Sequence, residues 1–207
     1  SDNKNYSFHR YYYETVLQPG VGGPPMVVYG RLVEDENTGA IVLQYWLFYY
    51  YNDWFNKHEG DWELIQVMLS PEGEPQHVVL SQHHGGTRRV WRDAQVEEGT
   101  HPVAYVALGS HANYFWGDEV YPNGQDVGNT RVEIIDRTGS AGRSIPAVIP
   151  LPAAIDNPDD PASTAGGEWL LFGGNWGETA TIGDFGGPSG PSQKGQQWQQ
   201  PYQWGLD

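Results

Sequence analysis

The run from Ala40 to Tyr51 constrains the fold more than any other part of the chain. It is rich in β-branched and aromatic residues, and its apolar positions show no 3.6-residue period. Such a run is typical of a central strand that is buried on both faces. We therefore expect a sheet with this segment near its middle.

Six further segments have the composition of strands, and turn residues stand between several of them. They are Met26–Glu34, Asp61–Leu69, Gln76–His83, His101–Leu108, Arg131–Asp136 and Trp169–Phe172. Hairpin-like spacing and few helix signatures predict a mostly β fold, a single-domain β-sandwich over residues 1–207. The 27 glycines and 15 prolines predict long irregular loops, which we expect at 116–130 and 140–167.

The two ends of the chain differ from its centre. Residues 1–25 form an N-terminal extension with a tyrosine cluster, and residues 173–207 are rich in glycine, proline, glutamine and tryptophan. We expect this tail to wrap around the domain in an extended form, anchored by Trp176, Trp198 and Trp204. A disordered tail is the alternative, because low hydrophobicity favours disorder.

Charge and cysteine content exclude several classes of function. Eleven Lys and Arg against 26 Asp and Glu give a formal net charge of −15, which argues against nucleic acid and against electrostatic docking on anionic lipid. The absence of cysteine excludes disulfides, thiolate metal sites and cysteine nucleophiles. Divalent cations and neutral or cationic ligands remain open.

The sequence also bears on location. No stretch approaches the ~18 continuous apolar residues of a transmembrane helix, and Ser1 to Arg10 is polar with no hydrophobic signal core. We expect a secreted or cell-surface protein whose leader has been removed. A cytoplasmic protein is the alternative, and the sequence indicates no oligomeric state.

Two acidic residues carry the strongest chemical signal. In a strand, Asp61 and Glu63 share one face, about 7 Å apart, together with aliphatic side chains. Two buried anions are costly unless an arginine or a metal ion lies between them. His58 and Asp53 can reach the same place, and this set suits calcium or magnesium, with manganese or zinc as further choices. A salt-bridge or turn network without a metal is the alternative.

Histidines and aromatic residues form a second set. His83, His101 and His111 stand at strand ends, so they could line a cavity with the acidic residues and supply general acid or base groups. We expect ligand contacts from His101, Tyr51, Trp54, Asn113 and Tyr114. Scattered surface histidines and core aromatics are the alternative.

Arginines are clustered in one place only. Arg88, Arg89 and Arg92 form the basic patch of this acidic chain. The patch could hold an anionic group, and a solvated surface is the alternative.

Several motifs in this order resemble a known family. They run through Tyr45–Tyr49, Asn52–Trp54, His58–Glu63, Ser81–His83, His101–Tyr114, Gly174–Gly177 and Gly187–Pro191, with Lys194 and Trp198. Over roughly residues 40–200 the chain is similar to the domain of a vacuolar-protein-sorting-associated protein, the sixty-second of that naming series. That label records trafficking and implies no chemistry.

The segment from His58 to Glu63 is also similar to the signature His-Arg-His-Asp-Trp-Glu of secreted necrosis- and ethylene-inducing-like cytolysins. That resemblance implies a β-sandwich with a divalent cation in a surface cavity and binding to the sugar head groups of membrane sphingolipids. Carried over by position, the cation ligands are Asp53, His58, Asp61 and Glu63. The family's second histidine is Gly60 here and its leading glycine is Lys57, and both departures weigh against toxin-like activity.

These observations predict a β-sandwich that binds a divalent cation and through it recognises a glycan or lipid head group, with peripheral membrane contact left open. The alternative is a metal-dependent hydrolase or polysaccharide-cleaving enzyme that uses the same cavity, with His111 or His83 as general base. A structural interaction module with a stabilising ion is the third hypothesis.

Overall fold

A computed structural model describes residues 6–17, 22–54, 56–83, 85–127, 130–153, 166–177 and 186–207, without the side chains of residue 6 and of 123–132. The helices are short: α1 (Tyr6–Tyr12), the π-helical turn η2 (Tyr13–Leu17), the 3-10 turns η4 (Trp91–Asp93), η5 (Glu168–Leu171) and η6 (Pro191–Gln193), α3 (Gln196–Gln199) and α4 (Pro201–Trp204). No helix of the described residues is long and apolar enough to cross a membrane.

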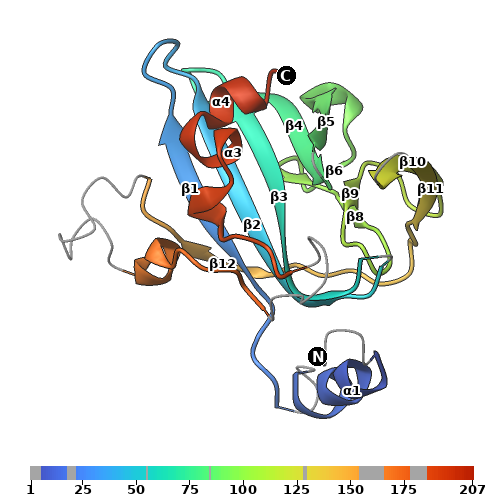
Figure 1. Cartoon of the computed structure of the whole chain (residues 1–207). Helices are drawn as coiled ribbons and strands as arrows, with labels where there is room; N and C mark the ends of the chain where they lie inside the picture. Colours follow the sequence, from blue (N-terminus) through green and yellow to red (C-terminus); the bar gives the residue numbers. More distant parts are fainter. Residues whose placement is uncertain are drawn as a thin grey trace.

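A six-stranded sheet in the order β12-β1-β2-β3-β4-β5 forms the main layer (Figure 1). Its strands are β1 (Val27–Glu34), β2 (Ile41–Asn52), β3 (His58–Leu69), β4 (Pro75–Gln82), β5 (Gly85–Val90) and β12 (Ala147–Pro150). Neighbouring strands are antiparallel except β1 and β12, which are parallel. The longest strands, β2 and β3, lie at the centre, where the sequence predicts a central strand.

Three short strand pairs accompany the large sheet: β6 (Val96–Glu97) with β7 (His101–Pro102), β8 (Tyr105–Val106) with β9 (Asn113–Tyr114), and β10 (Val120–Val127) with β11 (Thr130–Arg137). They lie beside β4 and β5 in Figure 1. The predicted mostly β, sandwich-like class is confirmed. The short strand pairs cover one face of the large sheet, and the C-terminal segment covers the other.

Some strand predictions are wrong. Residues 120–127 form β10 inside a segment predicted to be loop, and residues 147–150 form β12 inside the other. The predicted strand Trp169–Phe172 falls in the 3-10 turn η5, and the predicted strand His101–Leu108 is divided between β7 and β8.

One face of the sheet carries an aromatic core. Trp46, Trp62 and Leu64 pack there against the C-terminal segment. The three tryptophans named above as anchors of the tail, Trp176, Trp198 and Trp204, all belong to this cluster. The tail is not fully extended, because its short helices η6, α3 and α4 lie across the sheet (Figure 1). Residues 178–185 of the predicted tail lie outside the described residues.

Buried polar side chains hold the tail to this face. Gln44 and Gln66 bond to each other at 2.9 Å and donate to the carbonyl oxygens of Gln197 and Pro201 at 2.7 and 2.9 Å. The buried Arg31 donates to Gln44 and to the carbonyl of Trp198, whose ring lies 3.8 Å below the guanidinium. Gln44, Gln66 and Arg31 are all paired with the tail or with each other, and these contacts fix the position of the tail.

Gly60, in β3, makes a close approach between sheet and tail possible. Its φ is +70°, and a Cβ at this position would overlap the carbonyl oxygen of Trp176. Only glycine satisfies both conditions without strain.

We predict that Gly60→Ala lowers the free energy of unfolding by about 2 kcal/mol more than Gly73→Ala. Gly73 is the matched control, since its φ is +86° and a Cβ there would meet no atom within 4 Å. Urea denaturation of both variants measures the difference. Equal losses would show that the approach of Trp176 does not constrain position 60.

Candidate functional site

Two buried carboxylates lie on β3, where it pairs with the end of β2. Asp61 stands opposite Tyr49, and Glu63 stands opposite Leu47. Asp61 Oδ2 accepts hydrogen bonds from Asn52 Nδ2 at 2.9 Å and from His111 Nδ1 at 3.0 Å. We call Asp61, Glu63 and Asp136 the carboxylate cluster.

The two carboxylates have opposite pKa shifts. Burial alone would raise the pKa of Asp61, but the hydrogen bonds and charge of His111 and the bond from Asn52 outweigh it, so the pKa is lowered. Burial and the charge of Asp61 raise the pKa of Glu63 well above its ordinary value, against the hydrogen bond from the Ser81 hydroxyl and the charge of Lys194. Asp61 is therefore the ionised member of the pair, and Glu63 is biased towards its neutral form.

A lysine from the tail supplies positive charge to this pair. Lys194 follows η6, and burial lowers its pKa while the charges of Glu63 and Asp61 raise it. On the strand opposite, burial followed by the charges of Glu63 and Asp61 raises the pKa of Tyr49. Lys194 thus provides part of the positive charge that two buried carboxylates at this spacing require.

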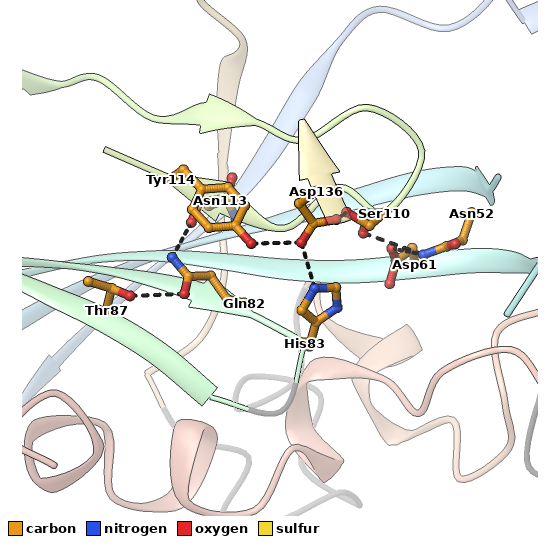
Figure 2. Close-up of polar contacts among 9 residues, drawn as sticks. All are labelled: Asn52, Asp61, Gln82, His83, Thr87, Ser110, Asn113, Tyr114 and Asp136. Atoms are coloured by element: carbon orange, nitrogen blue, oxygen red, sulfur yellow. Dashed lines mark hydrogen bonds and ion pairs between the residues drawn. The ribbon is translucent and has the colours of Figure 1, made fainter. Parts of the chain in front are cut away.

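Asp136, at the end of β11, is the second centre of the network (Figure 2). It is fully buried and accepts hydrogen bonds from Ser110 Oγ at 2.5 Å, Tyr114 Oη at 2.6 Å and His83 Nε2 at 2.7 Å. Burial alone would raise its pKa, but these three bonds outweigh it and the pKa is lowered.

The loop before β9 joins the two centres. Gly109 has φ +87°, and its carbonyl oxygen accepts from the backbone N–H of Asp53 at 3.0 Å. A Cβ at Gly109 would lie 2.9 Å from the carbonyl oxygen of Asp53, so glycine allows the loop to come this close to β2. The next residues, Ser110 and His111, then reach Asp136 and Asp61.

Two histidines of the site have the same surroundings. The ring of His111 stacks on Tyr49 with centroids 4.0 Å apart, and that of His83 stacks on Trp54 at 4.4 Å. Each also bonds a buried carboxylate, as described above. Both have left-handed backbone conformations, with φ of 61° and 52°. Such conformations are costly for residues other than glycine and concentrate at functional sites.

The predicted cation ligands are only partly brought together. Asp53 pairs its carboxylate with Lys57, and the His58 Nδ1 donates to the carbonyl of Asn56 at 2.7 Å, which leaves Nε2 as the ring atom able to bind a metal. Within the described ranges, no three His, Asp or Glu side chains lie close enough together to hold a metal ion. In this arrangement Lys57 pairs with Asp53, and the charge of Lys194 acts on Glu63 and Asp61.

The predicted ligand-contact residues have different positions. His101 is exposed in the β6–β7 pair, with Nδ1 3.0 Å from Thr100 Oγ1. Tyr51 stacks on His9 of α1 at 4.1 Å. Tyr114 belongs to the Asp136 network, and Asn113 beside it is fully buried with its side-chain amide unpaired.

The predicted site residues do not include several members of the observed site: Tyr49, Asn52, Ser81, Ser110, Asp136 and Lys194. The sequence does indicate that Asp136 is buried, because alternation in a strand places it on the same face as Val132 and Ile134, whereas Arg131 and Glu133 fall on the other face. Lys194 has no such indication apart from the family resemblance, since nothing local indicates that it reaches β3.

Comparison with known proteins gives a distant likeness. No family model and no curated protein matches the chain, so the resemblance to the vacuolar-protein-sorting-associated domain stays a prediction. The similar solved structures include necrosis- and ethylene-inducing proteins, the family whose signature resembles His58–Glu63.

Three of these structures show the degree of likeness. Necrosis and Ethylene inducing Protein 2 from the causal agent of cocoa's Witches Broom disease has 12% identity and a TM-score of 0.47, over 78% of this chain and 61% of that one. A structure described as a toxin fold for microbial attack and plant defense has 16% identity and a TM-score of 0.43, over 87% of this chain and 66% of that one. NLPPya in complex with glucosamine has 17% identity and a TM-score of 0.37, over 60% of this chain and 51% of that one. The chain thus covers only about half to two thirds of these structures, and such scores assign it no function.

We predict that Asp136→Asn lowers the free energy of unfolding at pH 7 by about 2–4 kcal/mol, because an amide nitrogen would face groups that donate to the carboxylate. The pKa of Asp136 is lower in the folded protein, so its stabilisation is complete above the ordinary value of 3.8 and is lost as the pH falls through the lowered value. Urea denaturation at pH 7 and pH 3 should show that the free energies of unfolding of the native chain and of Asp136→Asn differ less at pH 3. The same difference at both pH values would contradict this assignment.

Proposed function

We propose that the chain binds the polyhydroxylated head group of a glycan or glycolipid at the carboxylate cluster, outside a cell or at its surface. The observation that carries the proposal is the pair of left-handed histidines, His83 and His111, each stacked on an aromatic ring and hydrogen-bonded to a buried carboxylate. Left-handed backbone conformations at residues other than glycine are costly and concentrate at functional sites.

The chemistry of these side chains suits hydroxyl groups. An ionised Asp61 accepts hydrogen bonds, a neutral Glu63 can donate one, and the imidazoles can do either. The rings of Trp54 and Tyr49 offer flat apolar faces next to these polar atoms, a combination suited to the faces of a sugar ring. The acidic surroundings favour neutral or cationic head groups over anionic ones.

A divalent cation is the second component of the proposal. Asp61, Glu63 and the Nε2 atom of His58 are its first ligands, and Asp53 would join them by exchanging Lys57 for the ion. Bound there, the cation would supply positive charge to orient hydroxyl or phosphate oxygens.

We predict that calcium or magnesium raises the melting temperature of the native chain, and that a chelator reverses the rise. The Asp61→Ala/Glu63→Ala double variant should show no such response, because it lacks both central ligands. Differential scanning fluorimetry with each ion measures the effect. A native chain that does not respond would eliminate the cation and leave direct binding of the head group as the remaining form of the proposal.

An enzyme is the second candidate function. The opposite pKa shifts of Asp61 and Glu63 are the pattern of a carboxyl pair that divides acid and base roles. Glu63 would donate a proton to a leaving group, and His111, held by Asp61, would act as general base. Turnover of aryl glycosides by the native chain and its loss in Glu63→Gln would favour this candidate over binding alone.

We predict that Asp61→Asn weakens binding to the head group selected on a glycan array by at least tenfold. The amide has one accepting oxygen, which Asn52 and His111 would occupy, and a donating nitrogen replaces the carboxylate oxygen left for a ligand. Asp118→Asn is the matched control, since Asp118 is exposed and its carboxylate bonds Ser140. Isothermal titration of both variants measures the affinities. Equal affinity of native and Asp61→Asn chains, or no glycan bound on the array, would contradict the proposal.

A further inference from the structure

A pocket of about 230 Å³ lies beside the carboxylate cluster and meets it at Tyr114. Its walls come from β4, β5, the segment after β9 and the start of β10. The residues that line it are Gln82, Thr87, Arg89, Tyr114, Phe115, Trp116, Tyr121 and Pro122. The proposed function uses the cluster and leaves this pocket without a role.

Strand register explains how an arginine comes to face this pocket. In β5, Thr87 pairs with Leu80 and Arg89 with Val78, and Leu80 and Val78 pack with Phe115. Thr87 and Arg89 are two residues apart, so they share that face. Arg88, between them, points the other way and donates to the carbonyl oxygens of Gly205 and Leu206 at 3.1 and 2.7 Å.

The basic patch of the sequence therefore has three separate roles. Arg88 holds the end of the tail, and Arg92 is exposed and lies 3.7 Å from Asp93. Arg89 stacks over aromatic rings, with its guanidinium carbon 4.9 Å from the centroid of Trp116 and 5.4 Å from that of Phe115.

Among the described residues, the guanidinium of Arg89 has no hydrogen-bond acceptor and no ion-pair partner. Its Nε is buried with no hydrogen bond, and the structure gives Arg89 no ion pair with any described residue. The other polar groups of the pocket are bonded. Thr87 donates to Gln82 at 2.9 Å, Gln82 donates to the carbonyl of Asn113 at 2.8 Å (Figure 2), and Tyr121 donates to the carbonyl of Trp116 at 3.1 Å. A buried unpaired donor is uncommon and requires an explanation.

We propose that this pocket binds a small carboxylate carried on a six-membered ring. The planar guanidinium fork matches a carboxylate with two parallel hydrogen bonds, and Trp116, which is 44% exposed, offers a face for the ring. The pocket is smaller than the ~300–1,000 Å³ of most ligand sites, which fits one ring. Thr87 Oγ1 retains lone pairs that can accept from a hydroxyl on a sugar acid.

This site is independent of the proposed function. It selects an anion, whereas the carboxylate cluster favours neutral or cationic groups. If no glycan binds at Asp61, the proposal for the pocket still stands. If no carboxylate binds in the pocket, the proposal for the carboxylate cluster still stands.

Isothermal titration and tryptophan fluorescence of the full chain test the proposal, with glucuronate and benzoate as ring carboxylates. Glucose and benzyl alcohol are the uncharged counterparts, and acetate is a carboxylate without a ring. We expect one of the two ring carboxylates to bind at least tenfold more tightly than its uncharged counterpart and than acetate. Preference for glucuronate identifies a sugar acid as the ligand, and preference for benzoate an aromatic acid.

Variants assign the binding to Arg89. Arg89→Gln should abolish it, and Arg89→Lys, which keeps the charge and loses the fork, should weaken it at least fivefold. Arg92→Gln is the control and should bind like the native chain, because its side chain is 83% exposed. Absence of binding by both ring carboxylates, binding no tighter than that of acetate, or unchanged binding in folded Arg89→Gln would overturn the proposal.

Discussion

The burial of carboxylates at one end of the central strands governs the architecture around them. Asp61 and Glu63 follow the two-residue period of β3, so both face the same side of the sheet. Anions in such a place are stable only if donors and positive charge surround them. The loop at Ser110 and His111, the Ser81 hydroxyl and Lys194 of the tail all meet that requirement. Segments far apart in the sequence are thereby fixed to one point.

The same requirement connects the cluster to its surroundings. Figure 2 shows hydrogen bonds from Thr87 through Gln82 to Asn113, and from Tyr114 through Asp136 to His83 and Ser110. Two hydrogen-bonded sets of polar groups, which meet in the chain at Asn113 and Tyr114, therefore lie between the large sheet and the short strand pairs. A ligand at the carboxylate cluster would contact groups whose own partners are already fixed, which favours a pre-organised site.

Much of the sheet could be predicted because its strands have strong local patterns. The run that forms β2 has no helical period, and the face shared by Asp61 and Glu63 follows directly from alternation. β10 was missed because Pro122 and Gly124 are strand breakers, and its pairing with β11 compensates for them. The Trp169 segment was mistaken for a strand because an apolar run of four residues fits either a strand or a buried turn.

The site was predictable only as far as its local part. Asp61, Glu63 and His111 were found from spacing and strand ends, and they do lie together. Asp53 was assigned to the same set although Lys57, four residues later, was a competing partner. Lys194 and Asp136 reach the cluster through tertiary packing, which no local pattern in a single sequence encodes.

If His83 and His111 mark a ligand site, their imidazole signals should respond when a ligand binds. Nuclear magnetic resonance would follow the ring protons of all histidines while a glycan head group that binds the chain is added. His77 on β4 and the exposed His101 are internal controls, since neither bonds a carboxylate of the cluster in the described structure. We expect the His83 and His111 signals to shift in a saturable way while those of the controls stay in place. Saturable binding that leaves the His83 and His111 signals unmoved would contradict this expectation.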